Sequence, residues 1–510
     1  MSRSNPGLRH RFAARRRVLE RSITGLALAC AITAASTGWA DAIPPTPIPD
    51  GAPATAFIGA PGKGTKVKAT KVPQHPFMSK NATSNIHNDA FMTDTYAKKG
   101  PIGQNMQRVS YFTGGGPCAS ITFDKKGRII AACIVPANPQ LKLFDPKTLN
   151  TLASMPLPPK PPAPDNLYQD FSGGGYFYLD NKDRAVLFTA DRHIHIVAVT
   201  GTKKAPAFTA QADFDLTSLI PDTDRTTSVL PDWSGRIWFV TLHGIVGALD
   251  PATAQVESVS LGEAIENSFA VDDTGGVYIV TDKAQYRFDA DTTGKPSVTW
   301  REMYKNSGIR KPSQVNAGSG TTPTLLGDEW LAITDNADPM NVVVYRRKRD
   351  VVGSRVVCEQ PVFSQGASAT ENSLIGAGRS LVVENNYGYT GPTITSNGAS
   401  TTAGLERVDI NADGHGCSLV WHSDERAPSV VAKLSLATGL VYTYTKDAGD
   451  AADPWYLTAL DFATGETKWK QLAGTGVYFN NNYAPVTIGP DGSAYVGTLG
   501  GLVKLRDGKK

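Results

Sequence analysis

The sequence predicts an all-β fold, an eight-bladed β-propeller, and two repeated hairpins are the main reason. From about Gln107 the chain alternates strand-length apolar runs with turns and has little helical periodicity. The first hairpin recurs as ITFDKKGRIIAAC from Ile121, YLDNKDRAVLFTA from Tyr178, LPDWSGRIWFV from Leu230, AVDDTGGVYIV from Ala270 and TIGPDGSAYVG from Thr487. The second recurs as LFDPKTL from Leu143, ALDPATAQV from Ala248, RFDADTTGK from Arg287 and ALDFATGETKW from Ala459. Two hairpins in each repeat give four strands, which is one propeller blade.

The number of repeats predicts the number of blades. Eight first strands begin near Cys118, Phe171, Ser228, Asn267, Thr321, Asn372, Ser429 and Tyr483. The fifth and sixth repeats are irregular, so a seven-bladed ring is the alternative. A blade cannot bury both of its faces alone, so the blades are expected to stack around a ring.

The last repeat is one strand short. Its strands are expected at 485–488, 494–498 and 502–505. The segment Gln107 to Phe112 (QRVSYF) precedes the first repeat and is the candidate for the missing outer strand. Such pairing would close the ring and remove an exposed sheet edge.

Three segments are expected along the chain. Residues 1–42 read as a signal peptide, because Arg15–Arg17 precede an apolar run from Ile23 to Ala35, and Ala40 and Ala42 suit cleavage. Arg15-Arg16 also resembles a twin-arginine signal, and an ordinary export signal is the alternative. Residues 43–106 are expected to form an extended arm, either draped over the fold or partly disordered, because they are rich in Pro, Gly, Lys and Thr. Residues 107–510 are expected to form the propeller.

Charge and cysteines bound the location and the partners. Without the seven arginines and two acidic residues of the signal, 44 basic and 45 acidic residues remain, which gives no support for nucleic-acid binding. Four cysteines remain, and an even number in an exported protein favours disulfides. Cys118–Cys133 is the favoured pair because these residues flank one hairpin, and Cys358–Cys417 would then join neighbouring outer strands. We expect a periplasmic or extracellular protein without a membrane span.

One repeat resembles a known family. ALDFATGETKW, ending at Trp469, looks like the tryptophan-docking repeat of pyrroloquinoline-quinone (PQQ) type propellers. The resemblance implies a propeller in which tryptophan packs between adjacent blades. The dehydrogenases of this family carry a vicinal cysteine pair against the quinone, and this sequence has no adjacent cysteines. The same repeat also occurs in propellers that act as assembly scaffolds.

Propeller geometry predicts where a ligand site lies. The start of the first strand and the end of the second strand of each blade share one end of the channel, so polar residues there should converge. Starts of first strands supply Glu266, Asn267, Glu371, Asn372 and Asn481, and ends of second strands supply Asp191, His243, Asp282, Asp335, Glu384 and Asn386. Turn formation alone would also place Asn and Asp at strand ends.

We assign hypothetical roles to these residues. Carboxylate and amide oxygens are the ligands that calcium prefers. The predicted metal ligands are Glu266, Glu371, Asp282 and Asp335; the cofactor-binding residues are Asn267, Asn372, Asn386 and Asn481; and the catalytic residues are His243, Glu371 and Glu384. His243 would act as a general base beside a Lewis-acidic calcium.

The function that follows is a small-molecule binder at the channel mouth, and the sequence leaves open whether it is an enzyme. The resemblance implies an oxidoreductase with PQQ, whereas the polar ring favours a calcium-assisted hydrolase, such as a lactonase, or a lyase. A non-catalytic scaffold that binds another envelope protein is the third reading.

Three weaker patterns complete the set. Asp409 to Gly414 matches the start of an EF-hand loop, but Val420 stands where the loop needs Glu, so a plain turn is the better interpretation. His193 and His195 should share one side of a strand, as a metal pair or as surface residues. Aromatic residues near the mouth line a pocket or pack between blades; they are Tyr168, Phe171, Tyr387, Tyr389, Tyr478 and Tyr483.

Overall fold

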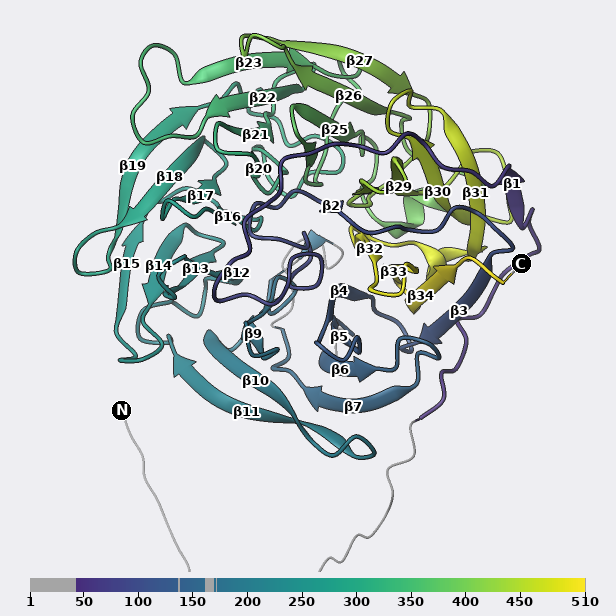
Figure 1. Cartoon of the computed structure of the whole chain (residues 1–510), viewed down its shortest axis with the longest axis horizontal. Helices are drawn as coiled ribbons and strands as arrows, with labels where there is room; N and C mark the ends of the chain where they lie inside the picture. Colours follow the sequence, from purple (N-terminus) through teal and green to yellow (C-terminus); the bar gives the residue numbers. More distant parts are fainter. Residues whose placement is uncertain (1–42, 136–137, 161–168, 171, 510) are drawn as a thin grey trace, which may run out of the picture. The chain divides into compact units, whose positions relative to one another are not determined.

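Eight β-sheets stand in a ring, and the four strands of each of the first six blades follow one another from the innermost strand to the rim (Figure 1). The computed structural model describes residues 43–509 except 136–137, 161–168 and 171, and the predicted signal peptide lies outside the described residues. Asp41–Lys510 forms one unit, separate from Met1–Ala40. The eight-bladed prediction is therefore confirmed, and the seven-bladed alternative is wrong.

The strands of the first four blades follow in chain order. Blade 1 holds β4 (Cys118–Phe123), β5 (Ile129–Cys133), β6 (Gln140–Phe144) and β7 (Thr151–Pro156); blade 2 holds β8 (Tyr178–Leu179), β9 (Ala185–Phe188), β10 (His193–Gly201) and β11 (Pro206–Asp215). Blade 3 holds β12 (Thr226–Pro231), β13 (Ile237–Thr241), β14 (Ile245–Leu249) and β15 (Val256–Ser260); blade 4 holds β16 (Ala270–Val271), β17 (Val277–Val280), β18 (Ala284–Ala290) and β19 (Pro296–Met303).

The second half of the ring is built in the same way. Blade 5 holds β20 (Thr324–Leu326), β21 (Trp330–Thr334), β22 (Asn341–Arg346) and β23 (Val356–Pro361); blade 6 holds β24 (Ile375–Ala377), β25 (Ser380–Glu384), β26 (Leu405–Ile410) and β27 (Cys417–Ser423). Blade 7 holds β28 (Lys433–Ser435), β29 (Leu440–Thr445), β30 (Pro454–Asp461) and β31 (Thr467–Thr475), with β1 (Phe57–Gly59) and β2 (Thr95–Tyr96) added at its two edges. Blade 8 holds β32 (Val486–Ile488), β33 (Ala494–Thr498), β34 (Gly501–Arg506) and β3 (Gln107–Phe112); two short 3₁₀ helices are η2 (Pro392–Thr395) and η3 (Val477–Phe479).

One expected strand pairing and two expected disulfides are present in the fold. The strand β3 pairs antiparallel with β34, with Gln107 opposite Arg506, so the N-terminal segment supplies the outer strand of blade 8 as predicted. The disulfide Cys118–Cys133 links β4 to β5, and Cys358–Cys417 links the outer strands of blades 5 and 6. Both predicted disulfide pairs are confirmed.

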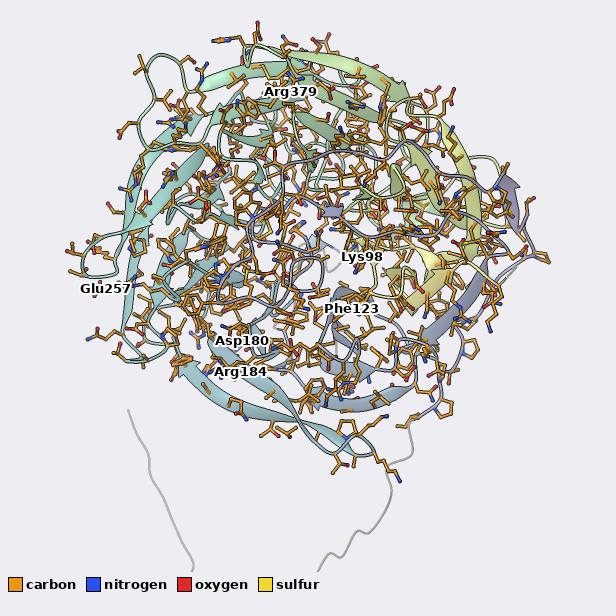
Figure 2. The ribbon with its side chains drawn as sticks, in the orientation of Figure 1. Lys98, Phe123, Asp180, Arg184, Glu257 and Arg379 are labelled. Atoms are coloured by element: carbon orange, nitrogen blue, oxygen red, sulfur yellow. A yellow bond between two sulfur atoms is a disulfide. The ribbon has the colours of Figure 1, made fainter. Side chains whose placement is uncertain are left out.

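An aspartate that recurs in the turn of the first hairpin explains why this hairpin forms. In blade 2 the Asp180 carboxylate accepts hydrogen bonds from the backbone N–H groups of Lys182 and Arg184, each at 2.9 Å. Asp180 also lies beside the Arg184 side chain, with 2.6 Å between Oδ2 and Nε (Figure 2). A side-chain carboxylate that satisfies its own turn in this way favours a tight hairpin.

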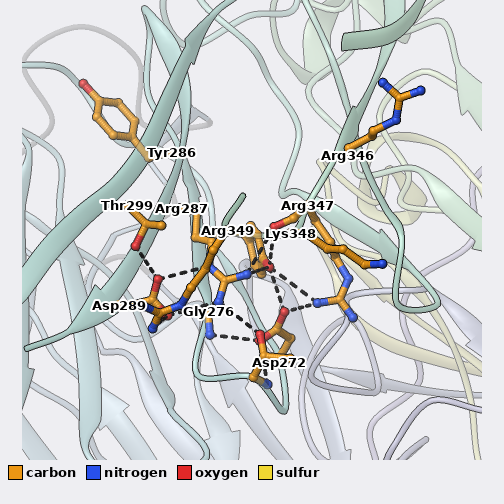
Figure 3. Close-up of polar contacts among 12 residues, drawn as sticks. Asp272, Gly276, Tyr286, Arg287, Asp289, Thr299, Arg346, Arg347, Lys348 and Arg349 are labelled. Carbon is orange, nitrogen blue, oxygen red and sulfur yellow. Dashed lines mark hydrogen bonds and ion pairs between the residues drawn. The ribbon is translucent and has the colours of Figure 1, made fainter. Parts of the chain in front are cut away.

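The equivalent aspartate of blade 4 also joins two blades. Asp272 accepts the backbone N–H of Gly276 at 2.9 Å and pairs with Arg347, which follows the third strand of blade 5 (Figure 3). Arg287 of β18 bonds to Asp289 and to the carbonyl oxygen of Arg347 in the same buried group. Charges that are paired and hydrogen-bonded can be buried between two sheets without an orphaned partner.

Outer-strand tryptophans also contact the next blade. The indole N–H of Trp421 on β27 donates to the carbonyl oxygen of Phe462 in blade 7 at 2.9 Å. The guanidinium of Arg355 in blade 5 lies over the ring of Trp300 on β19, with its Cζ 4.5 Å from the ring centroid. Trp469 is fully buried, and its ring lies beside those of Phe57 and Tyr442, which belong to its own sheet. The sheets therefore pack through large aromatic groups as well as through ion pairs.

Residues 83–96, here named the channel plug, differ most from the extended arm that the sequence predicts. Most of the plug is buried, and its trace crosses the middle of the ring (Figure 1). Its carbonyl oxygens accept N–H groups of the innermost strands of six blades. The acceptor and donor pairs are Thr83 with Phe123, Ser84 with Leu179, Ala90 with Val271, Phe91 with Leu325, Thr93 with Gly376 and Asp94 with Leu434.

The plug satisfies its own backbone as well as that of the ring. The Asp89 carboxylate accepts the backbone N–H groups of Phe91 at 3.0 Å and Thr93 at 3.2 Å, which fixes a turn inside the channel. Just beyond the plug, Lys98 reaches blade 1, 6.0 Å from the ring centroid of Phe123 (Figure 2). Burial together with these backbone hydrogen bonds makes the plug part of the core. No helix of the described residues has the length and apolar character needed to cross a membrane.

Candidate functional site

A cavity of about 650 Å³ lies in the channel, between the plug and the starts of the innermost strands. The plug contributes Ile86 and His87. The remaining described lining is Gly115, Gly116, Pro117, Ala119, Ser120, Ile134, Lys160, Asp170, Gly175, Tyr176, Asn267, Glu371, Asn372, Ser373, Val431, Val477, Tyr478, Asn482, Tyr483, Ala484 and Leu499. Val477 and Tyr478 are 45% and 41% exposed and mark the solvent side. A mainly apolar cavity with a few convergent polar groups is the usual form of a small-molecule site.

His87 is the first polar group of the cavity, and buried charges hold it. Its Nδ1 lies 3.0 and 3.1 Å from the two carboxylate oxygens of Asp94. Asp94 is in turn paired with the ammonium of Lys433 on β28, and both side chains are fully buried. Lys433 also donates to the carbonyl oxygen of Ile86 at 2.7 Å, so one cation fixes the plug on both sides of His87.

This arrangement directs the second ring nitrogen of His87 toward the cavity. With Nδ1 bonded to Asp94, the acceptor nitrogen is Nε2, and it lies 3.5 Å from Oγ of Ser373. A carboxylate that fixes the tautomer of an imidazole in this way prepares the other nitrogen to accept a proton.

Glu371 is the second titratable group of the cavity. It is 6% exposed, and its Oε2 is buried without a hydrogen-bond partner. Burial, together with the neighbouring Glu266 carboxyl, raises the pKa of Glu371 well above its ordinary value. Burial also raises the pKa of Glu266 from 4.5 to about 8, although Arg310 and Asn316 act in the opposite direction. At neutral pH this pair therefore favours protonated carboxyl groups, which can donate protons.

A glycine allows Glu371 to take this place. A Cβ atom at Gly320, before the innermost strand of blade 5, would lie 2.2 Å from the carbonyl oxygen of Thr370 and 2.6 Å from Oε2 of Glu371. Any larger residue at 320 would therefore displace the carboxyl group.

Amide side chains complete the polar part of the site. Nδ2 of Asn372 donates to Oδ1 of Asn386 at 2.9 Å, while Oδ1 of Asn372 is buried without a partner. Asn386 lies behind the cavity lining, and its Oδ1 also accepts the backbone N–H of Glu371 at 3.0 Å. Asn267 lines the cavity, and its Oδ1 accepts the hydroxyl of Tyr176 at 3.4 Å. Two buried unpartnered oxygens, on Glu371 and Asn372, therefore remain for a ligand.

Three other predicted residues lie away from the cavity lining. Glu384 is buried between blades 6 and 7, where it accepts the hydroxyl of Thr443 at 2.6 Å, and burial raises its pKa to about 8. Asn481 bonds the carbonyl oxygen of Ala484 at 2.9 Å and shapes a turn. His243 is on the surface, with a side chain 60% exposed, because its strand ends in a projecting turn.

Of the four predicted metal carboxylates, Glu266 and Glu371 are neighbours, whereas Asp282 and Asp335 are held by other partners. Asp282 pairs with Lys283 at 2.7 Å and accepts the backbone N–H of Ala264. Asp335 accepts the backbone N–H and the side-chain amide of Asn341, at 2.8 and 2.7 Å, and holds its own loop. Within the described residues, Asp191, His193 and His195 form the group of three whose ligand atoms all lie within 4.8 Å of one another.

Of the six aromatic residues expected at the mouth, Tyr478 and Tyr483 line the cavity. Tyr389 packs against Tyr483, with ring centroids 5.3 Å apart, and Tyr387 is absent from the described lining. Tyr168 and Phe171 lie outside the described residues.

The sequence analysis missed His87, Asp94 and Lys433. The first two lie in the segment that we expected to be an extended arm, because it is rich in Pro, Gly, Lys and Thr. One signal was present: from Ile86 to Met92 (IHNDAFM) the composition becomes apolar and acidic, unlike the rest of the arm. No local pattern indicates that Lys433 faces Asp94, more than three hundred residues away.

Fold and cavity together define a β-propeller with an enclosed channel site. No family model matches the chain. It is 29% identical over 307 residues to an uncharacterized protein of Archaeoglobus fulgidus; the match covers 54% of this chain and 59% of that protein, so less than two thirds of the relative is spanned. A europium-containing methanol dehydrogenase matches in structure with a TM-score of 0.51 and 12% identity, over 83% of this chain and 90% of that chain. BamB of Moraxella catarrhalis matches with a TM-score of 0.44 and 12% identity, over 79% and 98%.

Neither predicted cofactor fits the described lining. PQQ is a tricarboxylate and needs several cations, whereas the described lining offers Lys160, which already lies 3.7 Å from Asp170. Calcium takes about six to eight oxygen ligands. The cavity supplies two buried unpartnered oxygens, and Asp282 and Asp335 are engaged elsewhere.

Proposed function

We propose that this protein binds a small, partly apolar organic molecule in the channel cavity and catalyses proton transfer on it, as a hydrolase or lyase. The observation that carries this proposal is the position of His87 in the cavity lining, with Nδ1 held 3.0 Å from buried Asp94. A purely structural histidine would have no need of a cavity on its second nitrogen.

The chemistry divides between two groups. His87, with Nε2 as acceptor, is the general base. Glu371 is the general acid, because burial raises its pKa and keeps its proton available. An acid and a base in one partly apolar cavity support reactions in which a proton leaves one atom of the ligand and another is delivered nearby.

An oxidoreductase is less well supported, since the described lining does not suit PQQ. The envelope scaffold remains a prediction, as do export and the twin-arginine route. A small-molecule ligand accounts for the cavity volume and for the two unpartnered oxygens of Glu371 and Asn372.

The test uses the full mature chain with p-nitrophenyl butyrate and δ-valerolactone as probes. Ala119→Trp should fill the cavity, because Ala119 lines it from β4, and should reduce turnover of whichever probe is accepted at least tenfold. Ala252→Trp, in an exposed turn of blade 3, is the matched control and should retain turnover. Equal turnover in the two variants, or no turnover and no binding of anilinonaphthalene sulfonate by the wild type, would contradict the proposal.

A further inference from the structure

We propose that Ser373 is a nucleophile that His87 activates and Asp94 orients, so that the protein hydrolyses esters or lactones through an acyl-enzyme. The inference rests on the proposed function and deepens it. Oγ of Ser373 lies 3.5 Å from Nε2 of His87, whose Nδ1 lies 3.0 Å from Asp94. A hydroxyl, an imidazole and a carboxylate in this order define a nucleophile, its base and the group that orients the base.

Three features favour a functional over a structural interpretation. Ser373 lines the cavity and is half-buried, so a substrate can reach its hydroxyl. His87 and Asp94 are 2% and 0% exposed, so the base cannot turn away. The Ser–His distance is longer than a full hydrogen bond, which is common for such pairs before substrate binds.

The reaction balances within the named groups and water. Oγ of Ser373 attacks the acyl carbon while its proton passes to Nε2 of His87. Collapse of the tetrahedral intermediate breaks the acyl–oxygen bond, and His87 returns the proton to the leaving alcohol. Water then attacks the acyl carbon while its proton passes to Nε2 of His87. The acyl–Oγ bond breaks, the acid is released, and His87 gives this proton to Oγ, which regenerates Ser373. The Glu371 proton lies in the same cavity and can be donated to the oxyanion.

Another seryl group of the chain provides a matched control. Ser268 belongs to the same Glu-Asn-Ser triplet, in blade 4, but its Oγ lies 2.8 Å from Oγ of Ser228 and has no histidine beside it. If position and local sequence alone made a serine reactive, Ser268 would react as Ser373 does.

The experiment combines a fluorophosphonate–rhodamine probe with intact-mass and peptide analysis. Wild type and Ser268→Ala should each gain one adduct, located on Ser373, and Ser373→Ala should gain none. His87→Gln should slow labelling at least a hundredfold. Thermal unfolding checks that each variant is folded.

Three labelling outcomes would contradict the assignment of Ser373 as the nucleophile. They are no adduct on the wild type, an adduct on another residue, and equal labelling of Ser373→Ala. Turnover that is lost in His87→Gln but kept in Ser373→Ala would also overturn it, and would leave the proposed function intact because His87 would then activate water directly. Loss of the cavity dependence measured with Ala119→Trp would instead remove the proposed function.

A separate cluster carries a second inference: the geometry points to a site for a divalent transition metal such as zinc on blade 2. His193 and His195 alternate along β10, so their imidazoles share one face, with stacked rings and centroids 5.6 Å apart. Asp191 lies within 4.8 Å of both, and Asp213 on the neighbouring β11 reaches both, at 2.7 and 3.4 Å.

This ligand set matches a borderline metal. Two imidazoles and one or two carboxylates are typical ligands for zinc, and four such groups complete a tetrahedron. The hydrogen bonds that now join each imidazole to a carboxylate would be exchanged for bonds to the metal.

The test is isothermal titration of the EDTA-treated, tag-free chain with zinc chloride, and cobalt absorption as a second readout. Wild type should bind one zinc with a Kd of about 10 μM or tighter. His193→Ala and His195→Ala should each weaken binding at least tenfold. His422→Ala is the matched control, because His422 also pairs with two acids, Glu406 at 2.8 Å and Asp424 at 3.2 Å, but has no second histidine. No binding by the wild type, or equal binding in all variants, would overturn the site.

Discussion

Two identical triplets, Glu-Asn-Ser at 266–268 in blade 4 and at 371–373 in blade 6, occupy the same position before their innermost strands. Their serines have different partners. Ser268 is 4% exposed and bonds the hydroxyl of Ser228, whereas Ser373 is half-buried and faces His87 of the plug. The asparagines also differ, because Asn267 accepts a hydrogen bond from Tyr176 and Asn372 has an unpartnered oxygen.

This difference shows that the repeat determines where each serine lies, whereas the plug, which is not part of any repeat, determines which groups surround it. Blades 4 and 6 each place their triplet at the same end of the channel. The plug runs past blade 6 with His87 and Asp94 in place and passes blade 4 with the backbone of Ala90. Symmetry of the ring is therefore broken from inside, by a chain that belongs to no repeat.

The largest expected effect comes from removing Lys433 of blade 7, whose ammonium pairs with Asp94 beneath His87 and Ser373. Lys433→Met leaves the Asp94 charge buried without its cation and should lower the free energy of unfolding by about 3–5 kcal/mol. Chemical denaturation followed by tryptophan fluorescence measures the change. On the blade 4 side, Lys283→Met removes the partner of Asp282 at a lysine that is 56% exposed, and should cost under about 1 kcal/mol. Equal losses would show that the plug does not depend on its buried ion pair.

The next effect is on pH dependence and involves both triplets. Because the folded-state pKa of Glu266 is raised from 4.5 to about 8, the folded protein binds this proton more tightly than the unfolded chain. Its contribution to stability is full below pH 4.5, falls as the pH rises toward 8, and is lost above it, with a slope of up to about 1.4 kcal/mol per pH unit. Burial and the neighbouring Glu266 carboxyl also raise the pKa of Glu371 well above its ordinary value, so Glu371 should lose stability with rising pH in the same direction.

Substitution by glutamine should flatten these slopes. The free energy of unfolding of Glu266→Gln between pH 5 and 8 should vary less with pH than that of the wild type. The stability of Glu371→Gln relative to the wild type should also rise as the pH rises. A wild-type stability that rises across this window would contradict the assignment of protonated carboxyl groups.

The smallest effect separates the two serines by stability. Ser268→Ala removes one buried hydroxyl pair and should cost about 1 kcal/mol, and Ser228→Ala should cost a similar amount. Ser373→Ala should cost less, since its contact with His87 is long and half-buried. Thermal unfolding of the three variants measures this order, and a larger loss for Ser373→Ala would favour a structural role for that hydroxyl.

The fold was predictable because its signals are local and repeated. The turn aspartates such as Asp180, the apolar alternation and the QRVSYF strand each act within a few residues or copy one pattern. The site was predictable in part: Glu371, Asn372 and Asn267 line the cavity because strand starts converge in a propeller. His243 lies outside the described cavity lining, with a side chain 60% exposed, and its role as a base stays a prediction. His87 could not be found, since its role depends on Asp94 and Lys433 meeting inside the ring.

The placement of β3 and the plug has a consequence for how the molecule is made. The residues that fill the channel and complete the last sheet are synthesised before every blade they contact. The backbone groups of β3 and the plug that pair with the last blades therefore stay unpaired until those blades have been synthesised. Such long-range closure slows folding and gives the polypeptide a single cooperative finish, in place of growth one sheet at a time.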